Sequence, residues 1–311
     1  SKGLQGMVPN LNIDFTSGEP GQAAKINIRG EASINGGSPL ILIDGVASDA
    51  EELNRLLPED IETLSVLKDA SSAAIYGARA AFGVILITTK RAGQEGIKVS
   101  YSGYANLNTP TFMPEPVNAI EYMEAVNVAR ANANMDPQYT QEIINIYKNQ
   151  GADNFNYYDT NWKDQVIKKQ TFSHNHSVSL SGGSKIFHLY ANAGYFYQDG
   201  LVSNNDYSRM TLRLNSDAQV TKWMKIGLDV NVRQSKAVNP CMDSPESIIN
   251  KALTFTPVLS GVNNDGTWGF GQNGDNPIAI AKAGGIKTGV TPELGIKAVS
   301  YTHLRAHETT L

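Results

Sequence analysis

Apolar and polar side chains alternate along several long segments of the chain, and this rhythm predicts β-strands. Ile97, Val99 and Tyr101 would share one face of a strand, and Lys98 and Ser100 would lie on the other. The same two-residue period recurs in four further segments, most weakly in the last: 187–197, 210–220, 224–233 and 173–181. Because successive side chains of a strand point to opposite faces, we expect about five strands, each apolar on one face and polar on the other.

The length of these strands bears on the architecture. Strands of roughly 11–15 residues exceed the usual ~5–6 residues of globular proteins and suit tilted strands that cross a bilayer, which need about 9–11. The links at 182–184 and 220–223 are short, whereas the link at 197–207 is longer. Membrane β-barrels alternate short periplasmic turns with longer extracellular loops. The pattern therefore favours a barrel, although a soluble sandwich of two sheets also alternates and stays open as an alternative.

The first 92 residues have a mixed pattern that predicts a compact α+β domain. Short strands are predicted at four places: 25–30, 39–45, 64–68 and 83–90. The acidic residues after Pro58 predict a helix start, because carboxylates complement the helix dipole there. Asp69 and Gly77 would begin and end a second short helix. We therefore divide the chain into residues 1–92 and 93–298.

The longest link between the predicted strands runs over residues 109–170. It contains two amphipathic segments that predict helices, Ala119–Ala133 and Thr140–Asn149. We expect a helical insertion around residues 115–170 within the second part of the chain.

Composition narrows the function classes. The 311 residues carry a net charge of −4, and no block of Lys or Arg stands out, which argues against nucleic acid as a partner. The single cysteine, Cys241, excludes a disulfide or a Cys-based zinc site within the chain. No segment approaches the roughly 18 apolar residues of a membrane-spanning helix, but barrel strands do not need such a run.

Several short motifs suggest binding chemistry, and each has a simpler interpretation. The Gly269–Gly274 segment matches a dinucleotide fingerprint, but no strand precedes it, which favours a loop. His174 and His176 would share a strand face and could hold a metal; without a Cys or carboxylate at useful spacing, interfacial histidines of a barrel strand are favoured. Asn263–Gly266 lacks the Glu of a calcium loop and indicates a turn.

Aromatic residues and candidate nucleophiles complete the search for chemistry. Trp162, Trp223 and the tyrosines could stack on sugars, but we favour the aromatic girdles of a barrel. Ser71 and Ser72 lack an identifiable base, so no enzyme, cofactor or metal site is predicted.

A series of short motifs runs through the chain. In the first domain these are Leu4-Gln5-Gly6, Ile28-Arg29-Gly30, Ile43-Asp44-Gly45-Val46, Asp60-Ile61-Glu62, Val66-Leu67-Lys68-Asp69-Ala70-Ser71, Ala74-Ile75-Tyr76-Gly77, Arg79-Ala80-Ala81 and Gly83-Val84-Ile85. Later motifs are Asn161-Trp162, His174 to Gly183, Gly194-Tyr195, Tyr207-Ser208-Arg209 and Leu212-Arg213-Leu214-Asn215. Together they resemble the SusC/RagA family of TonB-dependent outer-membrane transporters over nearly all of residues 1–298.

The resemblance implies a fold and a function. The fold is an α+β plug domain followed by an incomplete antiparallel transmembrane β-barrel of about five strands, where the family has about 22. The implied function is import of oligosaccharides or peptides across the outer membrane, powered through TonB and assisted by a SusD-like surface lipoprotein. A plug would gate so wide a pore. The alternative is a surface or secreted β-rich binding module, in which a second sheet would cover the apolar faces.

The family's plug motifs supply candidate residues. We expect them to serve the plug fold, gating or plug–barrel contacts rather than ligand binding: Arg29, Gly30, Asp44, Gly45, Lys68, Asp69, Tyr76, Gly77, Arg79 and Gly83. Their charged members would be tolerated because a barrel lumen is polar.

Both ends of the chain depart from the family pattern. The chain begins within a motif, and no signal peptide or TonB box is recognised, so coupling to TonB is not traced to residues. Residues 299–311 resemble a translated sequencing adapter, and we expect the native sequence to stop near Ala298. A natural tail is the alternative; the coding DNA of codons 299–309 would decide.

Overall fold

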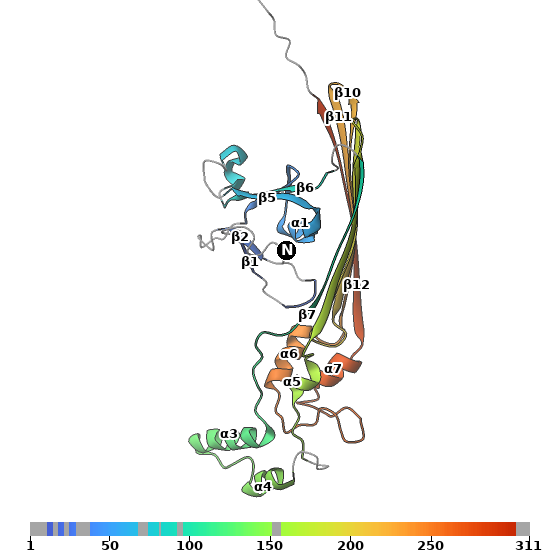
Figure 1. The fold of residues 1–311 in the computed structure, drawn as a ribbon. Coiled ribbons are helices and arrows are strands. Elements are labelled where there is room, and N and C mark those ends of the chain that lie inside the picture. The colour runs from blue at the N-terminus through green and yellow to red at the C-terminus, as the bar shows by residue number, and fades with distance from the viewer. Residues whose placement is uncertain are drawn as a thin grey trace, which may run out of the picture.

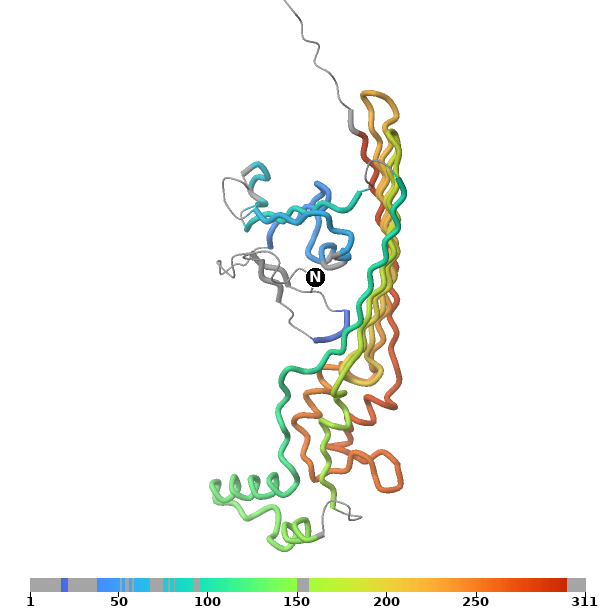
Figure 2. The backbone as a smooth tube through the Cα atoms, viewed as in Figure 1, coloured from blue at the N-terminus to red at the C-terminus, as the bar shows by residue number. Residues whose placement is uncertain are grey.

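The protein forms a small mixed domain beside a tall antiparallel sheet (Figure 1). The computed structural model describes residues 11–14, 18–21, 25–28, 38–67, 74–80, 82–91, 96–150 and 157–302. The backbone trace shows the long strands rising together on one side of the small domain (Figure 2). The N-terminal domain comprises the elements β1 to β6, and the wall sheet comprises β7 to β12.

The N-terminal domain is built on a four-stranded sheet with the order β4-β3-β6-β5, beside a separate β1-β2 ribbon. The strands are β1 (Leu11–Asp14), β2 (Lys25–Ile28), β3 (Leu40–Ile43), β4 (Val46–Ser48), β5 (Ile61–Leu67) and β6 (Val84–Thr89). Helix α1 (Ala50–Arg55) begins after Asp49, whose side chain accepts a hydrogen bond from the Glu52 amide at 2.7 Å. Leu53 of α1 packs against Ile41 and Ile85 of the sheet, burying the apolar runs that predicted these strands.

Two predicted helices of this domain differ in the structure. The helix expected to start at Pro58 is a single 3-10 turn, η2 (Pro58–Asp60), because the strand pattern of β5 begins at once with Ile61. The helix expected at 69–77 is described only from Ala74, where η3 (Ala74–Ala80) continues past Gly77 with a kink. Helix α1 and strands β1 and β4 were not predicted.

The wall sheet is antiparallel throughout, and each strand pairs with the next along the chain. Its strands are β7 (Gly96–Asn108), β8 (Thr171–Gly183), β9 (Phe187–Asp199), β10 (Asp206–Thr221), β11 (Met224–Pro240) and β12 (Ile286–Thr302). The five predicted strands are confirmed, and β12 is a sixth. The sheet does not close: β7 and β12 form its two edges in the described part of the chain.

On its inner strands β8 to β10, the wall sheet buries its polar face and leaves its apolar face more exposed. On β10, Leu212 is 49% exposed, whereas Asn215 is 2% exposed. Residues of the polar face contact the N-terminal domain, so we call this side inward (Figure 1). The strand pairs form only these three sheets within the described residues, and none of them covers the outward face. The sandwich alternative required such a sheet over Leu189, Leu212 and Leu228.

Helices gather at one end of the wall sheet (Figure 1). The β7–β8 link carries α3 (Ala119–Asn132), α4 (Gln141–Gln150) and α5 (Trp162–Val166), and the β11–β12 link carries α6 (Pro245–Thr254) and α7 (Pro277–Ala283). The short links, 184–186 and 222–223, join strands at the opposite end. This arrangement agrees with the predicted alternation of turn lengths and with the two predicted helices.

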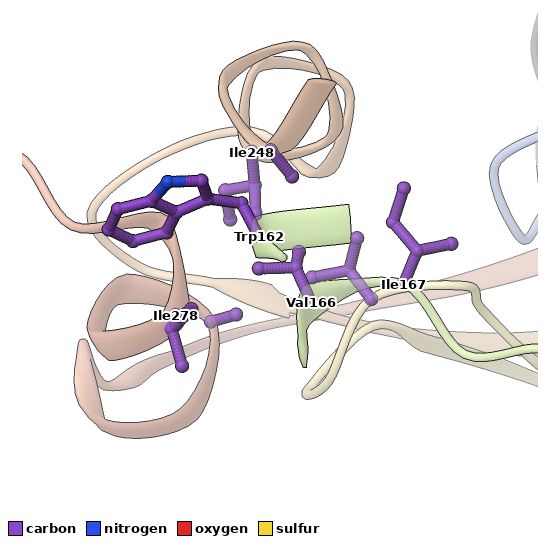
Figure 3. Close-up of a cluster of buried hydrophobic side chains, with 8 residues drawn as sticks. Trp162, Val166, Ile167, Ile248 and Ile278 are labelled. Carbon is purple, nitrogen blue, oxygen red and sulfur yellow. The ribbon is translucent and has the colours of Figure 1, made fainter. Parts of the chain in front are cut away.

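The helices α5, α6 and α7 share a small apolar core (Figure 3). Trp162 is its largest member at 2% exposure, packs against Ile248 and Ile278, and donates a hydrogen bond from Nε1 to the Thr256 carbonyl at 2.9 Å. The prediction of a girdle or sugar-stacking role is therefore wrong for Trp162. Its surroundings come from segments distant in sequence, which aromatic spacing alone does not reveal.

Two boundaries predicted from sequence stay predictions. Residues 92–95 lie outside the described residues, so the division at residue 92 is not tested. Strand β12 continues past Ala298 and pairs Thr302 with Met224, while residues 303–311 lie outside the described part. The pairing of β12 does not show whether residues from 299 onward are native or come from a sequencing adapter.

Among the described helices, none has the length and apolarity to cross a membrane.

Candidate functional site

The main contact between the two parts of the protein is a buried polar interface centred on the β3–β4 turn. Asp44 and Gly45 both have positive φ, 50° and 79°, as a two-residue hairpin turn of type I′ requires. The Asp44 carboxylate accepts hydrogen bonds from the Thr89 amide at 2.8 Å and hydroxyl at 2.6 Å. It also lies 3.5 Å from the Arg213 guanidinium, and the Asp44 carbonyl accepts from Lys297 Nζ at 2.9 Å.

Arg91 forms a second bridge, two residues after the end of β6. Its guanidinium lies 2.6 Å from Asp217 of β10 and 3.3 Å from Asp229 of β11. Burial alone would lower the pKa of Arg91, but the Asp229 and Asp217 carboxylates outweigh burial and raise it. The cation therefore stays charged while it bridges two strands of the wall. Lys225 lies 3.1 Å from Asp217 and adds positive charge beside the pair.

Asp60 forms the third contact and is 4% exposed. Its carboxylate accepts a hydrogen bond from the Tyr190 hydroxyl at 3.0 Å and a short one from the Asn192 amide, both on β9. Gly194 on the same strand allows close approach, because a Cβ there would lie 2.8 Å from Leu57 Cδ1. The N-terminal domain is thus bound to wall strands β9 to β12 by buried charges and amides.

Cavities remain between the two parts. One of about 580 Å³ is lined by charged side chains from both, including Asp44 and Glu52 on one side and Arg233 and Lys297 on the other. A second of about 460 Å³ lies around Arg91 and Trp223. Polar, incompletely packed contacts are typical of interfaces whose halves can separate, unlike the apolar core of a domain.

The structure brings only part of the predicted plug residues to this interface. Asp44 and Gly45 lie at its centre. Tyr76 packs against the apolar cluster of Leu42 and Val84 instead, and Arg79 is exposed. Gly77 (φ 68°, ψ −158°) and Gly83 (φ 96°) occupy backbone conformations that favour glycine. Arg29, Gly30, Lys68 and Asp69 lie outside the described residues, and the roles of the whole set stay predictions.

Sequence reasoning missed most residues of the interface. The sequence predicts Asp60 as a helix-start acid and as part of the Asp60-Ile61-Glu62 motif, not as a contact to the wall, and it does not single out Arg91 or Lys297. One sequence pattern did point to the interface. Arg213, Asn215 and Asp217 occupy every second position in the middle of a long strand, so they share one face, and polar side chains buried on such a face need hydrogen-bond or ion-pair partners. The partners lie more than a hundred residues away in sequence, so spacing alone could not identify them.

The Gly269–Gly274 and Asn263–Gly266 motifs take the simpler interpretations, and the role of His174 and His176 stays a prediction. Gly269–Gly274 is a loop whose Gly271 and Gly274 have positive φ, 66° and 83°. His174 and His176 lie on the outward face of β8, and the described residues contain no group of three His, Cys, Asp or Glu side chains that could hold a metal. Asn263–Gly266 forms a turn, in which the Asn263 side-chain amide donates to Thr267 Oγ1 at 3.0 Å and its Oδ1 accepts from Ser260 Oγ at 2.7 Å.

In this structure, buried ion pairs bind a folded domain to the polar face of a sheet of long strands, and the apolar face of the sheet is exposed. This combination is characteristic of one class of protein, a membrane β-barrel with a plug domain against its wall.

Comparison with known proteins identifies the family. Residues 1–84 match the family described as TonB-dependent receptor plug domain. The chain is 32% identical to TonB-dependent receptor P3 of Formosa agariphila over 89% of the chain and 26% of that protein. It is 35% identical to TonB-dependent receptor SusC of Bacteroides thetaiotaomicron over 87% of the chain and 26% of that protein. The chain belongs to the TonB-dependent receptors of the SusC/RagA kind.

A solved structure shares the fold. The RagAB peptide importer in its open-open state aligns with a TM-score of 0.68 at 24% identity, covering 86% of this chain and 32% of that one. The chain spans about a quarter of the length of the curated relatives it matches. Those relatives are named as receptors, not as enzymes.

Proposed function

We propose that the full-length protein imports oligosaccharides or peptides across the outer membrane of a Gram-negative bacterium. In this proposal the N-terminal domain is the plug that closes the barrel, and the interface of Asp44, Arg91 and Asp60 holds the plug against the wall. TonB supplies the work that opens it, and a SusD-like surface lipoprotein delivers cargo from outside. The relatives named SusC and RagAB support this assignment at the level of the family.

The observation that carries the proposal is the inverted polarity of the wall sheet. Its apolar outward side chains suit lipid, whereas its inward charges Arg213 and Asp217 are buried and pair with Asp44 and Arg91 of the plug side. A charged side chain without such a partner would be costly to bury. These paired charges give the plug a specific binding position on the wall, which a domain that closes a pore needs.

The alternative function, a non-transporting surface or secreted binding module, fits this polarity poorly. Such a module would need to cover Leu212, Leu228 and Leu294, which are 49%, 39% and 66% exposed. Exposed apolar surface of this extent marks a membrane or protein contact.

Fractionation and uptake test the proposal together. We expect the native full-length protein to sediment with outer membranes and to need detergent for extraction. Deleting its gene should abolish uptake of a fluorescent oligosaccharide or peptide that wild-type cells accumulate, and a plasmid copy should restore uptake. Recovery of the native protein in the soluble periplasm, or unchanged uptake of every such cargo after deletion, would contradict the proposal.

A further inference from the structure

Two rows of polar and aromatic side chains cross the outward face of the wall sheet near its helical end. The strand register places side by side His176, Tyr195, Met210 and Gln234, and next to them His174, Tyr197, Ser208 and Lys236. The following outward row, farther from the helices, is apolar: Val178, Ala193, Leu212, Val232 and Leu294. Beyond the two rows, toward the helices, the outward positions mix the apolar Leu107, Phe172 and Val238 with Asp206 and Thr288, so the two rows mark where the continuous apolar band of the wall ends.

The rings of the first two strands in these rows form one cluster. The centroids of His174 and His176 are 5.1 Å apart, and His174 lies 5.7 Å from Tyr195 and 5.6 Å from Tyr197. The Tyr101 hydroxyl lies 2.7 Å from His176 Nδ1. The buried neighbours Ser173, Asn175 and Ser177 point the other way, so the rings face away from the plug.

The tautomer of each histidine determines which ring nitrogen is a donor, and one tautomer suits the surroundings of both rings. When the Tyr101 hydroxyl donates to Nδ1 of His176, the proton of the neutral ring lies on Nε2. Nδ1 of His174 is buried and has no hydrogen-bond partner within the described part of the chain. A buried N–H without a partner costs more than an unmet acceptor, which again favours the proton on Nε2. Each imidazole thus presents an N–H donor.

We propose that His174, His176, Tyr195 and Tyr197 form a binding site for the phosphate oxygens of an outer-leaflet lipid headgroup. The site lies at the height of the headgroups, since the apolar band ends there, and it offers imidazole N–H and phenol O–H donors to an acceptor-rich group. The inference rests on the proposed outer-membrane location.

The charges around the cluster are balanced. Asp199 and Asp206 follow the two rows at the ends of β9 and β10, and Asp199 is paired with Lys168 at 2.8 Å. Lys236 is exposed and lies in the same row as Tyr197 and His174. A metal is the competing ligand for two histidines, but a third His, Cys, Asp or Glu ligand is missing from the described residues.

Lipid titration tests the site in the full-length protein. Detergent-solubilised protein is titrated with micelles containing bisphosphorylated lipid A, or the same lipid with both phosphates removed, and native mass spectrometry counts the bound lipids. We expect half-saturation at a roughly tenfold lower concentration for the phosphorylated lipid, because one hydrogen bond to a charged group contributes about that much. In His174→Phe/His176→Phe the preference should fall below about twofold, since Phe donates no hydrogen bond.

Two matched variants sharpen the test. Val178→Phe/Leu180→Phe changes the next two outward positions of the same strand and should keep the full preference. His174→Gln/His176→Gln supplies an amide N–H in place of Nε2–H and should keep most of it. Equal binding of both lipids by the unmodified protein, or a preference that survives the Phe pair, overturns the proposal. Sedimentation with outer membranes in the same preparations separates this outcome from a failure of the proposed function.

Discussion

At the residue scale, the single buried carboxylate of Asp60 contributes to binding the plug to the wall. It ends a 3-10 turn of the plug and lies at 4% exposure against β9, where Tyr190 and Asn192 donate to it. The neighbouring Glu62 is exposed. Two acids separated by one residue therefore have different roles, one in binding the plug to the wall and one in solvent.

Replacing Asp60 with asparagine removes the charge while keeping the shape. We expect the plug–wall contact to weaken by about 1.5–3 kcal/mol, which is the usual contribution of a hydrogen bond to a charged group. Hydrogen exchange on the full-length protein would show faster exchange across the Tyr190–Asn192 segment and β5. Glu62→Gln is the control and should leave these rates unchanged. Equal rates in Asp60→Asn and the unmodified protein would show that Asp60 does not hold the plug.

At the scale of elements, the alternation of side chains predicted β7 to β11 but not β12. In β12, Gly289, Pro292 and Gly295 interrupt the two-residue period, and only pairing with β11 reveals the strand. Asn276 illustrates a second limit. Asn276 before Pro277 is a helix-start signal, and its side chain does cap α7 through the Ile278 and Ala279 amides. Its sequence context does not announce that the same side chain donates to the Gly261 and Gly269 carbonyls.

Asn276 therefore holds the 260–276 loop against α7, and its replacement by alanine should release both. We expect a loss of about 2–4 kcal/mol in local stability from the missing cap and the two unpaired carbonyls. Limited proteolysis of the full-length protein should cut this loop faster. Asn276→Asp keeps the capping acceptor but loses the donors, so it should fall between. Asn264→Ala changes an exposed turn and should behave as the unmodified protein does; a similar acceleration in that variant would refute the assignment.

At the scale of the whole molecule, the wall sheet is an open surface with two free edges and an apolar outer face in the described part of the chain. The general architecture could be predicted, because alternation over long strands and the plug motifs both point to it. The position of the plug on the wall could not be predicted, because it depends on ion pairs such as Arg91 with Asp217, which form only when segments distant in sequence meet.

This 311-residue chain, produced alone, should remain monomeric only in detergent. Its unpaired strand edges and exposed apolar face favour association in water. Analytical ultracentrifugation with and without detergent would compare the two states. A monodisperse monomer in detergent-free buffer would show that the outward face is not a lipid-facing surface.

The strict alternation of the wall also limits which changes of length the protein can tolerate. One residue inserted between Thr211 and Leu212 of β10 would change the face of every later residue in the strand. Arg213 and Asn215 would then point outward, and Leu212 and Leu214 would point inward. Two inserted residues would return each side chain to its original face, but they would move Arg213 two residues along the strand and away from Asp44. Descendants of this sequence should therefore gain or lose residues in the links 109–170 and 241–285, and almost never singly within a strand.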